Sequence, residues 1–181
     1  SCKPFVGSDV LGSALGMDKL AMKAAFLAAG LPQVPYTSVY VKDLRNKDQD
    51  LIVKQIEELT YPCFVKPANL GSSVGISKAS NRKELLEGLK VASLHDKRIV
   101  VEKAVKAREL ECAVIGNRIR EVSLVGEVQF NSEWYDYKTK YSQGSSKLLI
   151  PAPISNQLSK QVQKLSLKAC EAIGAKGMAR V

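Results

Sequence analysis

The chain has 181 residues, of which 45% are hydrophobic and 25% charged, the composition of an ordinary globular protein. No apolar run approaches the roughly 20 residues of a membrane helix, and the first ten residues lack the apolar core of a secretory signal, so we expect an intracellular protein with no membrane partner. The formal net charge of +9 favours anionic ligands, but the basic residues are dispersed without a nucleic-acid-binding motif, which argues against a nucleic-acid partner.

Helical and extended patterns alternate along the chain. Residues 17–29 are rich in Ala, Leu and Met and precede Gly30 and Pro32, so they predict a helix. The remaining predicted elements are, in order, a helix at 50–59, a strand at 63–66, a strand beginning at 76–78, a helix beginning at Asn81, a strand at 98–102, a hairpin of 109–115 and 118–125, a long loop at 131–147, a helix opened by Ser155 and a strand at 177–181. Hairpins and helices in separate groups favour an α+β fold over a doubly wound parallel sheet.

Three local signals mark the ends of these elements. Asn81 followed by Glu84 is a capping-box pattern at the start of a helix. Ser155 is the expected cap of the last helix and Gly174 its expected end. The dipeptide Gly116-Asn117 predicts the turn of the hairpin.

The strongest candidate for a binding site follows the strand at 63–66. Lys66 ends this buried strand, where a lysine is costly unless it meets an anion. The loop Gly71–Gly75 after it offers hydroxyl and backbone N–H donors that can surround phosphate oxygens. The loop is not a Walker motif, because no Lys-Ser or Lys-Thr pair follows its second glycine. The residues alone are equally compatible with a glycine-rich hairpin beside a solvated lysine.

Two further groups of residues could take part in binding. Glu102 and Glu109 bracket the end of a strand and its connector, where they could accept from an amino group and from ribose hydroxyls, although a solvated edge explains them as well. Four of the eleven aromatic residues fall within Trp134–Tyr141. Such a loop could close over a phosphorylated site or form a stacking platform for single-stranded nucleic acid.

The sequence offers few metal ligands. The four cysteines (Cys2, Cys63, Cys112 and Cys170) are far apart, and His95 is the single histidine. A zinc site would require closely spaced pairs, so we expect neither a metal nor a disulfide here. We expect three of the cysteines to be small core residues, and His95 to be an exposed loop residue without a catalytic role.

Taken in order, several of these motifs resemble the D-alanine–D-alanine ligase family of the ATP-grasp fold. The matching segments are Ser13–Lys19, Val65–Pro67, Gly71–Gly75 with Ser77–Lys78, Val101–Lys103 with Glu109, Tyr135–Tyr137 with Lys140–Tyr141, Pro151–Ala152 and Gly177–Arg180. The resemblance implies an α+β ATP-grasp fold in three parts: a remnant of the N-terminal substrate domain at 1–15, a central subdomain at 16–105 and an incomplete C-terminal subdomain at 106–181.

The resemblance also implies roles for individual residues. Lys19 and Lys66 match the two lysines that contact the nucleotide phosphates, and Arg180 matches the arginine that contacts the acyl phosphate and the tetrahedral oxyanion. Ser72 and Tyr141 resemble a hydrogen-bonded pair that closes the site. The other residues implied in ATP binding are Gly71, Ser73 and Val74 in the phosphate-covering loop, Glu102, Lys103, Ala104 and Val105 at the adenine, Glu109 at the ribose and Lys140 at the transferring phosphate.

The implied reaction joins two D-alanines through an acyl phosphate, with ATP and Mg²⁺ (or Mn²⁺) as cofactors, to make D-alanyl-D-alanine for peptidoglycan. The family's metal ligands lie beyond the position of Arg180, so we expect none before Val181 and a chain cut short at both ends. The isolated polypeptide should then bind nucleotide weakly and lack useful activity. A homodimer of the full-length protein, in the cytoplasm of a bacterium or less plausibly in a plastid, is also implied.

Other functions remain open at this point. The acceptor could be D-lactate or D-serine, although Lys140-Tyr141 resembles the form that accepts D-alanine. A different ATP-grasp ligase, acting on another amino acid or peptide, is a second alternative. A non-catalytic ATP-grasp nucleotide-binding module is a third. A single-strand nucleic-acid binder would leave Lys19, Lys66 and Glu109 unexplained.

Overall fold

The computed structural model describes residues 3–45, 49–130 and 146–181. Its contacts divide the chain into two compact units. Unit 1 comprises Ser1–Met17, Ala21–Pro32 and Ala107–Val181, and unit 2 comprises Asp18–Leu20 and Gln33–Lys106. Among the described residues, none of the helices combines the length and apolar character needed to cross a membrane. The three-part division expected from the sequence stays a prediction.

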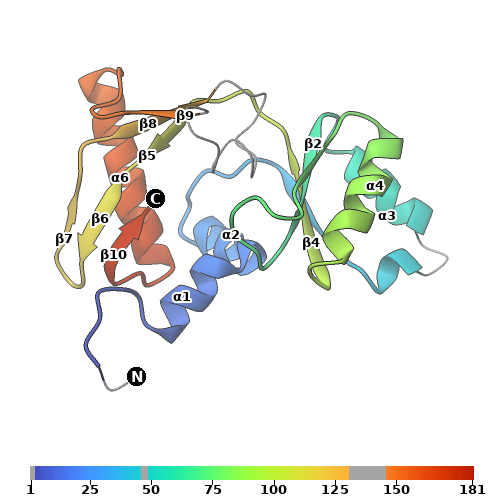
Figure 1. Ribbon diagram of the computed structural model, residues 1–181, viewed down its shortest axis with the longest axis horizontal. Coiled ribbons are helices and arrows are strands. Elements are labelled where there is room, and N and C mark those ends of the chain that lie inside the picture. Colours follow the sequence, from blue (N-terminus) through green and yellow to red (C-terminus); the bar gives the residue numbers. More distant parts are fainter. Residues whose placement is uncertain (1–2, 46–48, 131–145) are drawn as a thin grey trace. The chain divides into compact units, whose positions relative to one another are not determined.

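Unit 2 is a four-stranded antiparallel sheet with two helices on one face (Figure 1). The strand order is β1 (Tyr36–Tyr40), β4 (Arg98–Lys103), β2 (Cys63–Pro67) and β3 (Ser77–Ala79). The helices are α3 (Gln49–Glu57) and α4 (Arg82–Ser93), with a short 3-10 helix, η1, at Asp43–Arg45. The antiparallel sheet confirms the predicted α+β class, whereas β1 was not predicted.

The two faces of this sheet differ in character because side chains alternate along each strand. Cys63 and Val65 of β2, together with Ile99 of β4, join the core that the helices cover. The helices contribute Val53, Ile56, Leu85, Leu89 and Ala92 to the same core. On the opposite face, the strand register aligns four side chains in one row across the sheet, namely Lys78, Phe64, Glu102 and Tyr36. The face of the sheet that the helices do not cover, called the polar face below, thus carries charged side chains among aromatic ones.

The capping box predicted at the start of α4 is confirmed. The Asn81 side chain accepts from the Glu84 backbone N–H at 3.0 Å, and Glu84 accepts in return from the Ser80 N–H at 2.8 Å. The bond from the Ser80 N–H and a bond from the Asn81 side-chain amide hold the pKa of the Glu84 carboxyl below its ordinary value. Reciprocal capping fixes where α4 begins, and thus how its apolar side meets the sheet.

The helix predicted at 17–29 is present over 19–28, and a second helix that was not predicted precedes it. They are α1 (Val10–Met17) and α2 (Lys19–Ala28), separated at Asp18. The Asp18 carboxylate accepts from the Leu20 N–H at 3.0 Å, as an N-cap does, and the Lys19 N–H donates to the carbonyl of Ala68 at 3.0 Å. The interruption thus ties the start of α2 to the segment after β2.

In the described part of unit 1, besides α1 and most of α2, there are two three-stranded antiparallel sheets and a long helix. One sheet has the order β10 (Gly177–Arg180), β6 (Ala113–Gly116), β7 (Arg120–Val122), and the other has the order β5 (Glu109–Glu111), β8 (Gly126–Phe130), β9 (Ser146–Leu149). β6 and β7 form the predicted hairpin, but the expected first strand divides at Cys112 into β5 and β6, which join different sheets. The strands β8 and β9 were not predicted.

Helix α6 (Asn156–Ala172) packs against both sheets of unit 1. Ser155 caps its start by accepting from the Leu158 N–H at 3.2 Å, and Gly174 takes a left-handed φ of 65° just after its end, as predicted. The described cysteines Cys63, Cys112 and Cys170 are buried free thiols, which confirms their expected place in the core. Burial raises the pKa of the Cys63 thiol to about 11.

Helix α1 packs against the segment that follows α6. A Cβ placed on Gly12 would lie 2.9 Å from the Gly174 carbonyl oxygen, so only glycine allows this approach. Asp9 accepts from the Gly12 N–H at 3.0 Å and pairs with the Lys176 ammonium at 2.7 Å. These contacts explain why residues 1–17 group with the C-terminal part of the chain.

Candidate active site

A lysine and a glutamate pair on the polar face of the unit 2 sheet. Lys66 of β2 forms a short hydrogen-bonded ion pair with Glu102 of β4. Both side chains are largely withdrawn from water, with 23% and 11% of their surfaces exposed. The Lys66 ammonium also lies 5.6 Å from the centre of the Phe64 ring, an arrangement that stabilises a cation. A lysine expected at phosphate and a glutamate expected at adenine are therefore side by side.

Lys19 lies close to this pair and is held by backbone carbonyls. Its ammonium donates to the carbonyl oxygens of Leu70 at 2.6 Å, Pro67 at 3.1 Å and Ala68 at 3.5 Å. Burial lowers the pKa of Lys19, and the nearby Lys66 charge lowers it further, against the opposing effect of the Glu102 carboxylate. The structure thus brings together both lysines that the sequence assigns to phosphate binding.

The glycine-rich loop, defined here as residues 69–76, joins β2 to β3. Ser72, Ser73 and Gly75 all have left-handed backbone angles, with φ of 53°, 59° and 72°. Two turn bonds shape the loop: the Val74 N–H donates to Gly71 at 3.2 Å, and the Ile76 N–H donates to Ser73 at 3.3 Å. Successive turn residues of this kind can direct backbone N–H groups toward one anion.

The connector after β4 is held by main-chain bonds at its start. The Lys103 N–H donates to the Pro35 carbonyl at 2.9 Å, and the Ala104 N–H donates to the Pro62 carbonyl at 2.9 Å. Val105 follows with 55% of its surface exposed. Glu102 is therefore the last buried residue before a short exposed segment, the order expected for a strand end that meets an adenine.

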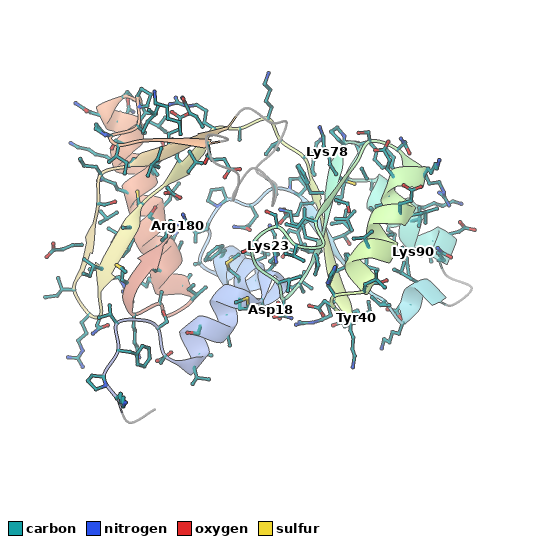
Figure 2. All side chains as sticks on the ribbon, in the orientation of Figure 1. Asp18, Lys23, Tyr40, Lys78, Lys90 and Arg180 are labelled. Atoms are coloured by element: carbon teal, nitrogen blue, oxygen red, sulfur yellow. The ribbon has the colours of Figure 1, made fainter. Side chains whose placement is uncertain are left out.

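The remaining described candidates belong to unit 1. Glu109 opens β5 opposite Val128 and is exposed. Arg180 ends β10 with its side chain 77% exposed and Nη1 3.4 Å from the Glu111 carboxylate (Figure 2). It borders a mostly apolar pocket of about 610 Å³, whose other lining residues include Ala113, Leu124, Ile150 and Met178. Its guanidinium is thus open to a ligand.

Lys140, Tyr141 and the rest of the aromatic loop, including Trp134 and Tyr135, lie outside the described residues. The pairing of Ser72 with Tyr141 stays a prediction for that reason.

Two groups of contacts near the candidate residues were missed by sequence reasoning. In unit 1, Arg108 makes a bidentate pair with the buried Glu127, at 2.7 and 2.8 Å. Hydrogen bonding from Arg108 holds the pKa of that carboxyl below its ordinary value. In unit 2, Asp18 pairs with Arg98 at one end of the sheet, near Tyr40 (Figure 2). The partners are 19 and 80 positions apart, too far for a local pattern to reveal.

The described side chains do not form a metal centre. Within residues 3–45, 49–130 and 146–181, no three His, Cys, Asp or Glu side chains gather as a metal site would require.

The chain is similar to a known protein family and to proteins named as ligases. The family described as "D-ala D-ala ligase C-terminus" matches residues 25–181. A D-alanine--D-alanine ligase of Prochlorococcus marinus is 63% identical over 99% of this chain and 52% of its own length. The enzyme of the same name from a Synechococcus species is 61% identical over 99% of this chain and 51% of its own length.

The chain is also similar to solved structures of ligases. VanG D-Ala:D-Ser ligase from Enterococcus faecalis superposes with a TM-score of 0.86 at 35% identity, over 98% of this chain and 51% of that one. The D-alanine-D-alanine ligase from Coxiella burnetii superposes with a TM-score of 0.79 at 28% identity, over 98% of this chain and 46% of that one. The chain spans about half the length of the curated relatives it matches.

Proposed function

Because the chain belongs to the D-alanine–D-alanine ligase family and has its ATP-grasp fold, we propose that it forms the nucleotide-binding core of an ATP-dependent ligase that joins two D-alanines. The names of relatives at 55–63% identity support this proposal. The observation that carries it is the group of Lys19, Lys66 and Glu102 beside the glycine-rich loop.

The proposed reaction has two steps. One carboxylate oxygen of the first D-alanine attacks the γ-phosphorus of ATP, ADP leaves, and an acyl phosphate forms. The amine of the second D-alanine then attacks the acyl carbon, loses a proton, and expels inorganic phosphate to leave the dipeptide. Neither step needs a covalent nucleophile from the protein, so the chain contributes by positioning and by neutralising charge.

Each unit supplies groups suited to part of this work. In unit 2, we assign Lys66 and Lys19 to phosphate oxygens, the glycine-rich loop to phosphate cover, and Glu102 to the adenine amino group. In unit 1, we assign Glu109 to the ribose hydroxyls and Arg180 to the developing oxyanion. Arg180 fits this assignment because its guanidinium is exposed, permanently charged and capable of several hydrogen bonds.

Three finer points are part of the proposal. Magnesium would screen the phosphate charges when bound, and we derive no step through it. D-alanine is favoured as acceptor by the relatives' names, with D-serine as the alternative because the E. faecalis neighbour is a D-Ala:D-Ser ligase. A homodimer in a bacterial cytoplasm is proposed from the family alone.

Nucleotide binding is the direct test of this core. We expect the chain to bind ATP in preference to GTP when titrated at millimolar concentrations in a calorimeter, because Glu102 accepts from the adenine amino group. Lys66→Ala should weaken ATP binding, whereas Lys90→Ala should not, since Lys90 lies on α4, which packs on the other face of the sheet (Figure 2). Equal binding of ATP by both variants would contradict the assigned site.

A further inference from the structure

Both ends of the glycine-rich loop contact the same turn, the residues His95-Asp96 that follow α4. At the first end, Asp96 Oδ2 accepts from the Asn69 backbone N–H at 2.7 Å and from its side-chain Nδ2 at 3.1 Å. Asp96 Oδ1 accepts from the Arg98 N–H at 3.0 Å, which fixes the carboxylate at the start of β4. One carboxylate thus joins the loop to the sheet across 27 positions of sequence.

At the other end, the imidazole of His95 lies against Gly75. A Cβ added to Gly75 would come within 2.6 Å of His95 Cδ2 and 2.8 Å of Pro67 Cγ. Real Cβ atoms essentially never make contacts that short, so a side chain at Gly75 would require the His95 or Pro67 ring to shift. Its left-handed φ of 72° is a second reason that glycine is required here.

Between these ends the loop is strained. Two consecutive serines, Ser72 and Ser73, have left-handed backbone angles, which cost of order 1 kcal/mol or more each for a residue with a Cβ. Such a conformation persists only when the surrounding structure determines it. The carbonyls that Lys19 binds belong to Pro67 and Ala68 before the loop and to Leu70 near its start, whereas the turn at His95-Asp96 contacts the loop near both of its ends.

We propose that the His95-Asp96 turn is a positioning element that presets the glycine-rich loop to receive nucleotide phosphates. The inference rests on the proposed function for the phosphate, but the anchoring itself can be measured without any ligand. His95 and Asp96 are positioning residues in this account, because they act through the loop and touch no substrate. The sequence pattern had assigned His95 no role.

The effect of Asp96 follows from its hydrogen bonds. They hold the pKa of this carboxyl below its ordinary value, although burial acts in the opposite direction, so the group is ionised near neutral pH. Hydrogen bonds to an ionised group are among the stronger ones. Asp96→Ala removes the bonds to Asn69 and Arg98, whereas Asn69→Ala removes only the side-chain bond.

The test is hydrogen–deuterium exchange of the chain, read separately for residues 69–76 and for β2 and β4. We expect amide exchange in the loop to rise at least about tenfold in Asp96→Ala and less in Asn69→Ala, with the strands unchanged, because the loss of a single hydrogen bond to a charged group already corresponds to roughly that factor. Asp50→Ala is the matched control, since the Asp50 carboxylate also accepts a hydrogen bond in unit 2, but from the Arg82 side chain, outside the loop.

The His95 contact has its own pair of variants. His95→Ala should raise exchange at the Gly75 end of the loop, and His95→Phe should leave it near the wild-type rate because a ring still fills the space. The second readout is the ATP concentration that half-protects the loop, which should rise about tenfold in Asp96→Ala and stay unchanged in Asp50→Ala.

Each outcome decides a separate question. If the loop of Asp96→Ala exchanges at the wild-type rate while the strands stay protected, the turn does not anchor the loop and the proposal is overturned. If the loop of Asp96→Ala exchanges faster but the ATP concentration that half-protects it is unchanged, the turn anchors the loop without presetting it for nucleotide, and that part of the proposal is overturned. If ATP never protects the wild-type loop, the proposed function fails while exchange still decides the anchoring. If the strands of Asp96→Ala also lose protection, the test passes to Asn69→Ala and His95→Ala. Loop exchange at the wild-type rate in both of these variants would overturn the proposal.

Discussion

Removal of the Lys66 ammonium should destabilise unit 2 through the charge left on Glu102. Lys66→Met keeps most of the side-chain length and packing but deletes the cation. Glu102 is only 8% exposed, so its carboxylate cannot recover full hydration when the partner is lost. Breaking a fully buried pair costs about 3–5 kcal/mol, whereas a hydrogen bond to a charged group contributes about 1.5–3 kcal/mol.

Because both side chains are partly exposed, we expect the cost of breaking this pair to lie nearer the lower of these two free-energy ranges. With 23% of Lys66 and 11% of Glu102 exposed, we expect Lys66→Met to lower the free energy of unfolding of unit 2 by about 2 kcal/mol. Glu102→Gln in the same background should restore part of this loss, because the neutral amide carries no buried charge.

The assay is a double-mutant cycle of Lys66→Met and Glu102→Gln. The exchange of β2 and β4 amides reports the free energy of unfolding of unit 2 without assuming that both units unfold together. A coupling free energy near 2 kcal/mol would agree with a desolvated pair. A coupling below about 0.5 kcal/mol, as exposed pairs give, would refute the reasoning from burial.

Three further predictions concern stability. Leu85→Ala should cost unit 2 about 3 kcal/mol in a denaturant titration because Leu85 is fully buried, whereas Leu86→Ala on the same helix, 36% exposed, should cost much less; equal losses would contradict the assigned core. Ser155→Ala should lower the stability of α6 by about 1 kcal/mol through loss of its cap, read as faster exchange in the first turn; unchanged exchange there would count against the cap. Because the pKa of Glu127 is depressed in the folded state, its pairing with Arg108 stabilises unit 1 fully above the ordinary glutamate pKa, and this contribution is lost as pH falls through the lowered folded-state pKa; an acid unfolding curve for Glu127→Gln identical to wild type would exclude this contribution.

Elements that depend on residues close together in the chain could be predicted from the sequence. The capping box at Asn81 and the cap at Ser155 depend on residues three apart, and both are present in the structure. The strand β2 was recognised from its short apolar run closed by Pro67. Lys66 was singled out by the cost of placing a lysine there, and the structure shows the compensating partner, Glu102.

Elements that depend on distant partners were missed or misplaced. The strand β1 is short and exposes Tyr40, so its apolar pattern is weak, and its pairing with β4 joins residues far apart in the sequence. The break at Asp18 arises from contacts with the segment after β2, which no helical pattern encodes. Asp96 is one of many acidic residues in the sequence, and only folding brings it to Asn69.

The central claim is the D-alanine-dependent use of ATP, and phosphate release measures it most directly. The assay uses the gene product to which this chain belongs, with Mg-ATP and D-alanine, and with L-alanine and D-lactate as controls. The account predicts phosphate release that requires D-alanine, is absent with either control alone, and falls sharply in Lys66→Ala. Absence of release with D-alanine, while ATP remains bound, would contradict the ligase assignment and favour a different acceptor or a nucleotide-binding module without catalysis.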